Sequence, residues 1–272
     1  MIRKGESMLY IGIDLGTSAV KLLLMDADGK IKKIASRTYD LSFPHPGWSE
    51  QNPADWYEQS IDGLKELLAE CDKSRVAGIS FGGQMHGLVT LDERDEVIRP
   101  AILWNDGRTT KECDYLNQII GKERLSAYTA NISFTGFTAP KVLWMKNNEP
   151  ENFAKIHKIM LPKDYLAFRL SGNYSTDVSD ASGTLFFDVK NRCWSEEMCE
   201  ICSIKTSWLP KVYESYEEVG TLLPELAKEL GVSDQVKIVA GAGDNAAAAV
   251  GTGTVGDGAC NISLGTSGTV FI

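Results

Sequence analysis

The sequence predicts an α/β protein built from two related parts, and three observations support this. Short apolar runs separated by turns open the chain as an antiparallel meander of strands, at residues 8–14, 19–25 and 30–39. Helical patterns then alternate with further buried strands. Residues 13–18 recur as residues 262–267, so a strand–Gly-Thr-Ser–strand unit is used twice. Such a repeat predicts two related domains that each begin with a phosphate-binding hairpin.

The positions of the repeats predict how the domains divide the chain. We expect residues 1–7 to be an N-terminal extension, because they are polar and Met8 can serve as a start. Residues 8–255 are expected to form a complete first domain. Residues 256–272 are expected to be only the opening strands of a truncated second domain, because the second copy ends after one hairpin.

Composition excludes several classes of partner. The chain has 272 residues, 43% of them hydrophobic and 24% charged, as in an ordinary globular protein. Its net charge of −9 argues against nucleic-acid and anionic-membrane partners. No apolar run approaches the length that spans a bilayer, and residues 1–7 are too short and polar for a signal peptide. We therefore expect a cytoplasmic protein.

The spacing of three cysteines suggests a zinc site, but the residues near them in the sequence do not support one. Cys193, Cys199 and Cys202 are close in sequence, but zinc needs a fourth ligand and no histidine is near them. Without a secretory signal, reduced thiols are expected. We interpret Cys199 and Cys202 as buried helix residues.

The remaining pattern predicts these elements. Asn52 and Pro53 suit the cap and first turn of a long helix. Residues 121–210 are expected to be a largely helical insertion. The other predicted segments are strands at 76–81, 88–91, 101–104 and 236–240, helices at 110–120, 140–147, 163–170 and 224–230, and a polar loop at 177–183.

Asp244 is the only charged residue between Val239 and Val255. It follows a predicted strand and a glycine turn, and it precedes a helix of very small residues. Small residues let another segment or a substrate approach the backbone closely. A single carboxylate in that setting predicts a general base at Asp244.

Polar groups at other strand ends are candidates for ligand contact. The Gly16-Thr17-Ser18 turn offers backbone N–H groups and hydroxyls that suit a phosphate, and Asp14 is placed for a magnesium ion. On this stretch alone, an ordinary hairpin with an acidic flank is the favoured alternative. His86 lies among glycines at a strand end, where we favour ligand contact over a structural role.

Two familiar motifs are rejected. Residues 78–82 match a hydrolase nucleophile elbow, but that fold needs a late catalytic histidine and only His157 follows His86. Residues 241–246 match a dinucleotide-binding fingerprint, but the carboxylate of Asp244 would repel a pyrophosphate there.

Taken together, a series of motifs in order resembles the FGGY family of carbohydrate kinases over nearly the whole chain from Met8. The segments that carry the resemblance are 14–18 with Lys21, 48–51, 83–87, 101–108, 137–141, 161–165, 179–183, 243–247 and 264–268. This resemblance implies an actin-like (ribonuclease H-like) ATPase fold, with a mixed five-stranded sheet and helices on both faces. It also implies a sugar site deep on the first domain, and ATP bound between the domains mainly by the second.

The resemblance also assigns roles to residues. Asp244 matches the catalytic aspartate, and Asp14 matches the aspartate beside the phosphates and Mg²⁺, which it is expected to hold through water. The implied sugar-binding residues are Gln84, Met85, His86, Trp104, Asn105, Asp106, Arg108 and Asn245. The implied ATP phosphate-binding residues are Gly16, Thr17, Ser18, Lys21, Gly265, Thr266 and Ser267.

The function implied is ATP-dependent phosphorylation of a ketopentose, most readily D-xylulose, since the Gln-Met-His triplet at 84–86 differs from that of glycerol kinases. Ribulose, gluconate and glycerol stay open as substrates, as does a non-catalytic sugar-binding relative. Because the second domain is expected to be truncated, the chain alone is expected to bind ATP weakly and to be inactive. Residues 256–272 are expected to pair with a second copy as a homodimer.

Overall fold

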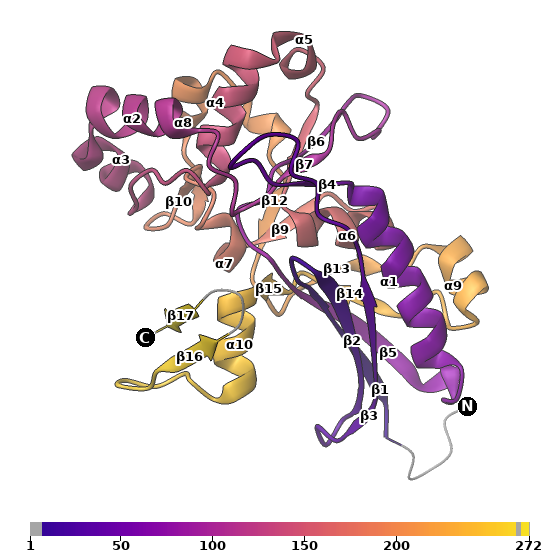
Figure 1. Cartoon of the computed structure of the whole chain (residues 1–272). Coiled ribbons are helices and arrows are strands. Elements are labelled where there is room, and N and C mark those ends of the chain that lie inside the picture. The colour runs from indigo at the N-terminus through magenta and orange to yellow at the C-terminus, as the bar shows by residue number, and fades with distance from the viewer. Residues whose placement is uncertain (1–6, 265–267, 272) are drawn as a thin grey trace.

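A mixed sheet forms the base of the computed structural model, which describes residues 7–264 and 268–271. Within that described part, seven strands join in the order β13-β14-β5-β1-β2-β3, and β15 pairs with β5 beyond the end of β14 (Figure 1). β1, β2 and β3 are antiparallel neighbours, whereas β5 runs parallel to β1, β14 and β15. The strands are β1 (Leu9–Leu15), β2 (Ala19–Asp26), β3 (Ile31–Thr38), β5 (Val76–Gly83), β13 (Glu218–Thr221), β14 (Lys237–Val239) and β15 (Ala242–Gly243).

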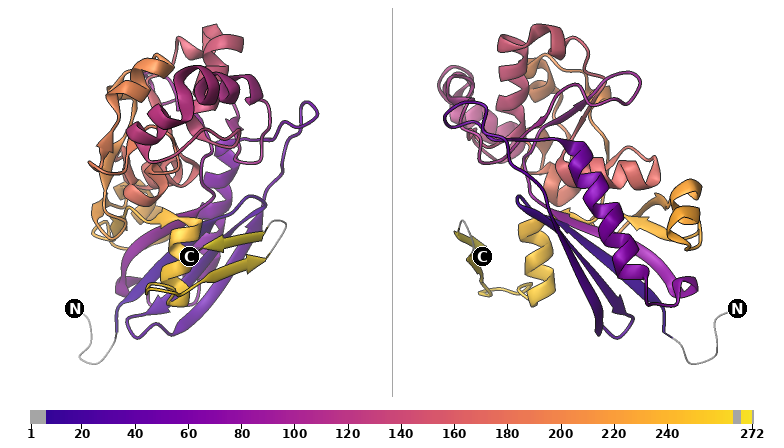
Figure 2. Two further views of the ribbon diagram at one scale, coloured as in Figure 1. Left: turned by 90° about the vertical axis from the view of Figure 1, so that its left-hand side faces the viewer. Right: turned by 45° about the vertical axis from the view of Figure 1, so that its right-hand side comes forward.

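The side chains of β1 alternate between the two faces of the sheet, and the apolar ones mark the covered face. Leu9, Ile11, Ile13 and Leu15 are buried, while Asp14 points to the opposite, open face. α1 (Pro53–Leu68) packs on β2 and β3 from the buried side. Figure 2 shows the sheet between α1 on one side and α10 (Asp244–Thr252) on the other. Helices therefore lie on both faces, as predicted.

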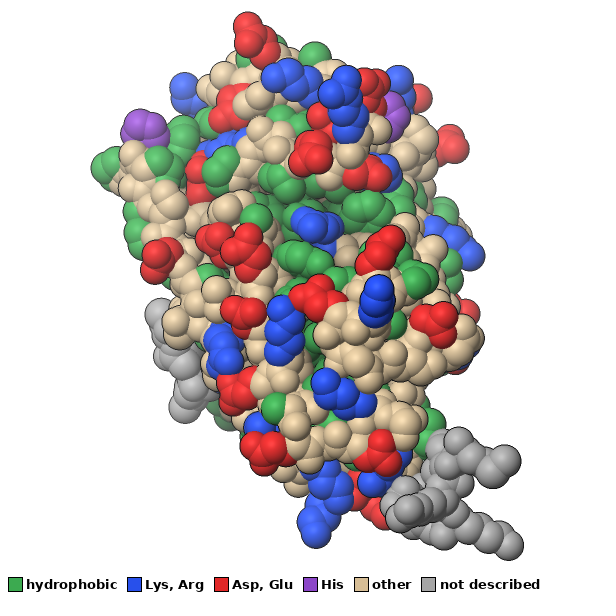
Figure 3. All heavy atoms as spheres, turned by 90° about the vertical axis from the view of Figure 1, so that its right-hand side faces the viewer, with side chains coloured by type: hydrophobic (Ala, Val, Ile, Leu, Met, Phe, Trp, Pro, Cys, Tyr) green, Lys and Arg blue, Asp and Glu red, His purple; other side chains and the backbone are tan. Residues whose placement is uncertain are grey.

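Local signals explain why α1 begins and how it is held. The side chain of Asn52 accepts the amide hydrogen of Ala54, and Pro53 occupies the first turn, as predicted. On the outer face, Lys65 of α1 pairs with Glu229 of α9 (Pro224–Leu230) at 2.7 Å. Acidic and basic side chains are interspersed over this face (Figure 3).

The predicted meander is confirmed, and the sheet is wider than expected. The five expected strands correspond to β3, β2, β1, β5 and β14. β13 extends the edge because it pairs antiparallel with β14, and the short β15 continues the path of β14 alongside β5.

A helical lobe stands above the sheet and has its own hydrophobic cluster, which includes Trp144, Phe186 and Met198. We define this lobe by α2 (Thr110–Asp114), the π-helix η2 (Tyr115–Gly121), α3 (Lys122–Thr129), α4 (Thr138–Asn148), α5 (Pro150–Phe153) and α8 (Glu196–Cys202). Cys199 and Cys202 are buried on α8, as predicted.

Short elements join the lobe to the sheet. α6 (Pro162–Ser171) and α7 (Val178–Ala181) lie between them. The other elements of the lobe and of this junction are β4 (Glu50–Gln51), β6 (Val89–Leu91), β7 (Ala101–Ile102), β8 (Lys158–Met160), β9 (Ser175–Asp177), β10 (Phe187–Asp188), β11 (Cys193–Trp194), η3 (Thr206–Trp208) and β12 (Lys211–Tyr213). The short helix η1 (Lys73–Arg75) instead connects α1 to β5.

Two predictions about the insertion were wrong in detail. Residues 110–120 do not form one α-helix, because the chain changes to π-helical geometry at Tyr115. Residues 177–183 are not a loop. Asp177 ends β9 and caps α7 by accepting the amide hydrogens of Ser179 and Asp180.

After α10, β16 (Asn261–Leu264) and β17 (Gly268–Phe271) pair antiparallel with each other. Gly265, Thr266 and Ser267, predicted to bind phosphate, lie outside the described residues. Among the helices of the described chain, none has the length and apolar character needed to cross a membrane.

Candidate active site

The carboxyl ends of β1, β5 and β15 meet at one edge of the sheet. In register, Asp14 lies beside Gly82, and Gly82 lies beside Ala242. Two strand spacings therefore separate the backbones of Asp14 and Ala242, which is about 10 Å. Asp244 follows two residues later, at the start of α10. In open α/β sheets, ligands bind at such edges.

The turn that leads to Asp244 depends on glycine. Gly241 has a φ of +75°, and a Cβ atom there would lie 2.2 Å from the carbonyl oxygen of Phe81. A Cβ atom on Gly243 would lie 2.9 Å from the sulfur of Met85. The backbone of this turn therefore packs directly against β5 and the segment that follows it.

Asp14 and Asp244 are solvent-accessible carboxylates at the same edge of the sheet. Partial burial raises the pKa of Asp244, and the negative charge of Asp14 raises it further. The hydrogen bond that Oδ1 of Asp244 accepts from the Asn245 amide at 2.7 Å acts in the opposite direction and lowers this pKa. Burial also raises the pKa of Asp14, while Lys21 opposes that rise. Each carboxyl group is thus shifted towards the range in which it can exchange protons near neutral pH.

His86 is held as a neutral ring. Its Nδ1 lies 2.8 Å from the carbonyl oxygen of Gly183, so Nδ1 carries the proton and Nε2 remains an acceptor. Burial lowers the pKa of His86 to about 4, because it disfavours the charged ring. The ring stacks on Phe137 with centroids 4.5 Å apart, and the backbone has a φ of 67°.

Other predicted contact residues surround this edge. The amide nitrogen of Asn245 lies 3.9 Å from the sulfur of Met85. The indole N–H of Trp104 donates to the hydroxyl of Thr17 at 2.9 Å, which connects the Gly-Thr-Ser turn to the predicted sugar side. The N–H of Gly16 donates to the carbonyl of Ala19 at 3.1 Å, and this bond closes the turn. Ser18 and Lys21 are exposed beside them.

Gln84, Asp106 and the side chain of Arg108 are buried and held by other residues of the chain. Gln84 is buried, and its Nε2 donates to Gln51 at 3.2 Å. Arg108 pairs with Asp106 and Glu50, both at 2.7 Å, and its guanidinium lies over the rings of Trp48 and Trp144. Asn105 is exposed and makes no side-chain hydrogen bond within the described chain. The sugar-binding roles of these four residues stay predictions.

Sequence reasoning missed a set of buried charges beside Asp244. Lys163, Asp164, Asp177 and Asp180 are essentially inaccessible to solvent. Lys141 is buried too, and it donates to the carbonyl oxygens of His86 at 2.8 Å and Gly136 at 2.7 Å. The polar composition of 177–183 was visible in the sequence. Its burial depends on contacts with distant segments, which left no local signal.

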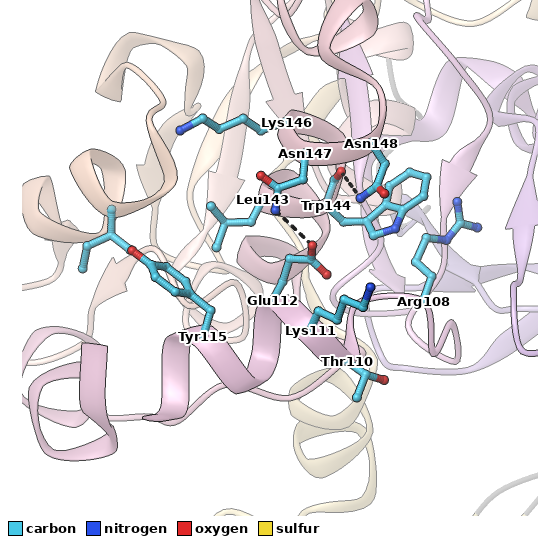
Figure 4. A pocket seen from close by; sticks show the side chains of 11 residues that line it. Arg108, Thr110, Lys111, Glu112, Tyr115, Leu143, Trp144, Lys146, Asn147 and Asn148 are labelled. Atoms are coloured by element: carbon cyan, nitrogen blue, oxygen red, sulfur yellow. Dashed lines mark hydrogen bonds between the residues drawn. The ribbon is translucent and has the colours of Figure 1, made fainter. Parts of the chain in front are cut away.

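A groove of about 730 Å³ opens elsewhere, between α2 and α4 of the helical lobe (Figure 4). Figure 4 shows Glu112 hydrogen-bonded to Asn147 on its wall, with Trp144 and Arg108 at one end. Asp14, His86 and Asp244 are not among the residues that line it. The groove is therefore separate from these three residues, although Arg108, one of the predicted sugar-binding residues, lines it.

Comparison with known proteins agrees with this geometry. Residues 9–251 match the family model for the FGGY family of carbohydrate kinases, N-terminal domain. The xylulose kinase of Escherichia coli (strain K12) is 45% identical over 263 residues, covering 97% of this chain and 54% of that protein. The chain spans about half the length of the curated relatives it matches.

Solved structures give the same result. One described as a xyloylose kinase from Brucella ovis superposes with a TM-score of 0.92 and 44% identity, over 96% of this chain and 54% of that one. A gluconate kinase from Lactobacillus acidophilus superposes with a TM-score of 0.93 and 29% identity, over 97% and 54%. The chain belongs to the FGGY family of carbohydrate kinases, and its fold is the actin-like ATPase fold of that family.

Proposed function

We propose that the protein carrying this chain phosphorylates a ketopentose, D-xylulose, at the expense of ATP. The observation that carries the proposal is the meeting of Asp14, Asp244 and a neutral His86 at the carboxyl edge of the sheet, beside a Gly-Thr-Ser turn. This supplies a carboxylate base, a sugar-hydroxyl partner and phosphate-binding N–H groups at one edge of the sheet.

In the proposed reaction, Asp244 accepts the proton of the sugar hydroxyl as that oxygen attacks the γ-phosphate. Its raised pKa suits this role, because a base is most effective when its pKa lies near the working pH. Nε2 of His86 accepts a hydrogen bond from another sugar hydroxyl, and Met85 and Asn245 line the approach. The N–H groups of Thr17 and Ser18 donate to phosphate oxygens, and Gly16, whose own N–H closes the turn on Ala19, lets the phosphate approach the backbone.

The residues present fit a magnesium ion that arrives with the nucleotide. The backbone of Asp14 is paired within the sheet, but its carboxylate accepts no hydrogen bond from the residues that the structure describes and is therefore available. No group of three or more His, Cys, Asp or Glu side chains in the described chain could hold a metal alone. Mg²⁺ commonly binds through one or two carboxylates, waters and substrate phosphates. Asp14 would hold it through water, and the ion would neutralise phosphate charge.

The choice of D-xylulose rests on the relatives. Several curated relatives at 40–45% identity are xylulose kinases, whereas the gluconate kinase that superposes well is only 29% identical. Ribulose, gluconate and glycerol are the competing substrates. We further propose a cytoplasmic location, with sugar and ATP as partners and no nucleic acid, in line with the net charge of −9.

An ADP-release screen tests the proposal. The purified protein carries the second domain, because the chain alone is expected to be inactive, and it is assayed with ATP, Mg²⁺ and each of D-xylulose, D-ribulose, gluconate and glycerol. We expect D-xylulose to give the highest kcat/KM, by at least tenfold. A higher value with gluconate would contradict the substrate assignment, and no sugar-dependent ADP release would contradict the kinase function.

A further inference from the structure

Asp177 is a buried hub that uses both carboxylate oxygens. Its Oδ1 accepts from the ammonium of Lys163 at 2.9 Å. Its Oδ2 accepts from the amide and hydroxyl of Ser179, at 2.9 and 2.6 Å, and from the hydroxyl of Ser215 at 2.7 Å. One carboxylate thus joins three segments that are distant in sequence.

Two of those segments hold the turn that precedes Asp244. The amide of Gly243 donates to the hydroxyl oxygen of Ser179 at 3.1 Å. The amide of Gly241 donates to the carbonyl oxygen of Ser215, also at 3.1 Å. The Ser179 hydroxyl gives its own proton to Asp177, so its lone pairs face Gly243. An unbroken path of hydrogen bonds therefore runs from Lys163 to the residue before Asp244.

The charges in this hub are costly to bury. Lys163 faces Asp164 at 2.7 Å and Asp180 at 3.7 Å in addition to Asp177. Neither carboxylate oxygen of Asp180 has a hydrogen-bond partner among the described residues. Hydrophobic residues often stabilise a core as well as a buried ion pair does, so stability alone does not account for such a cluster. Its place beside the Asp244 turn suggests what it does.

We propose that Lys163, Asp177 and Ser179 are positioning residues that fix the turn and so aim the carboxylate of Asp244 at the sugar hydroxyl. This inference rests on the proposed function for Asp244 as the base. The network touches the backbone beside the base and not the substrate. Weakening it should therefore lower kcat more than it raises the KM for sugar.

The test uses Ser179→Ala, which removes the acceptor of the Gly243 amide and, with it, the hydroxyl that donates to Asp177. Ser171→Ala is the matched control, because its hydroxyl bonds Ala167 and Asn173 and no atom of the turn. Amide hydrogen exchange at Gly243 and the kcat and KM for D-xylulose are measured in both. We expect Ser179→Ala to speed exchange at Gly243 and lower kcat about tenfold each, with KM within twofold. Ser171→Ala should change neither.

A second variant, Asp177→Asn, checks the charged part of the hub. It leaves Lys163 paired with Asp164 at 2.7 Å, while an amide nitrogen in place of Oδ2 cannot accept the hydrogen bonds of Ser179 and Ser215. It should show the same rise in exchange and the same kcat loss as Ser179→Ala.

The outcomes separate this inference from the proposed function. Unchanged exchange at Gly243 in both variants would overturn the positioning role, whatever the activity. Faster exchange with unchanged kcat would overturn it as well. If the wild-type protein releases no ADP with any sugar, the proposed function fails, and exchange alone then decides whether the network holds the turn.

Discussion

Lys141 and Lys163 are both fully buried, but the charges around them shift their pKa values in opposite directions. Burial lowers the pKa of Lys141 well below its usual value; Asp106 opposes this effect and Arg108 adds to it. The Lys141 side chain donates a hydrogen bond to the carbonyl oxygen of His86. Burial also works to lower the pKa of Lys163, but Asp164, Asp177 and Asp180 outweigh it and raise that pKa. One lysine thus supports the predicted sugar side and the other supports the base.

The pKa of His86 directly tests whether its ring is neutral in the folded protein. We expect its ring to titrate with a pKa of about 4, because burial disfavours the imidazolium. The measurement is a pH titration of the imidazole resonances by NMR, with the exposed His157 ring recorded in the same spectra. A pKa at or above 7 for His86 would contradict the neutral-acceptor role, because the ring would then be charged in at least half of the molecules at neutral pH.

Linkage gives the matching expectation for stability. The pKa of His86 is lowered in the folded state, so between about pH 6.5 and 4 the unfolded chain binds a proton that the folded chain does not. His86 therefore lowers the free energy of unfolding as the pH falls through that window, and it has no such effect above it.

At the scale of elements, the turn before Asp244 packs closely against β5, and this contact holds Asp244 at the candidate active site. Gly241 and Gly253 both have φ near +75°, but their surroundings differ. A Cβ atom on Gly241 would meet the Phe81 carbonyl, whereas one on Gly253 would meet nothing within 4 Å. An alanine would therefore be strained by the backbone conformation at both positions, but it would clash with a neighbouring atom only at Gly241.

Alanine substitutions separate these two effects. Gly253→Ala should lower the free energy of unfolding by about 1–2 kcal/mol, the usual cost of a left-handed residue. Gly241→Ala should cost roughly 2 kcal/mol more, because the backbone of β5 must also move. Urea unfolding measures both. Equal losses would show that the turn can relax away from Phe81.

Elements whose signals are local could be predicted from the sequence. The meander, the Asn52 cap and the glycine stop of α9 at Gly231 all depend on neighbouring residues, and the structure confirms them. The helix α7 was missed because residues 177–183 have the composition of a loop. Asp177, which caps this helix, contacts Lys163 and Ser215, and both are far away in sequence. The π-helical turn after Asp114 likewise has no pattern of its own.

At the scale of the whole molecule, the sequence placed Asp14 and Asp244 at strand ends. Only the strand order shows that β5 separates β1 from β15, and so how far apart the two carboxylates lie. The resemblance to the FGGY family is confirmed. The domain division at residues 255 and 256, and pairing of residues 256–272 with a second copy, stay predictions.

The most direct test of the account compares wild-type protein with Asp244→Asn, and uses Asp234→Asn as the control for loss of an exposed carboxylate. ADP release with D-xylulose and sugar binding by calorimetry are measured for each. We predict that Asp244→Asn lowers kcat by about 10²–10⁴-fold, the usual contribution of a general base, while sugar affinity changes less than threefold. Asp234→Asn should match the wild type. A kcat for Asp244→Asn within threefold of the wild-type value would contradict the assignment of Asp244 as the base.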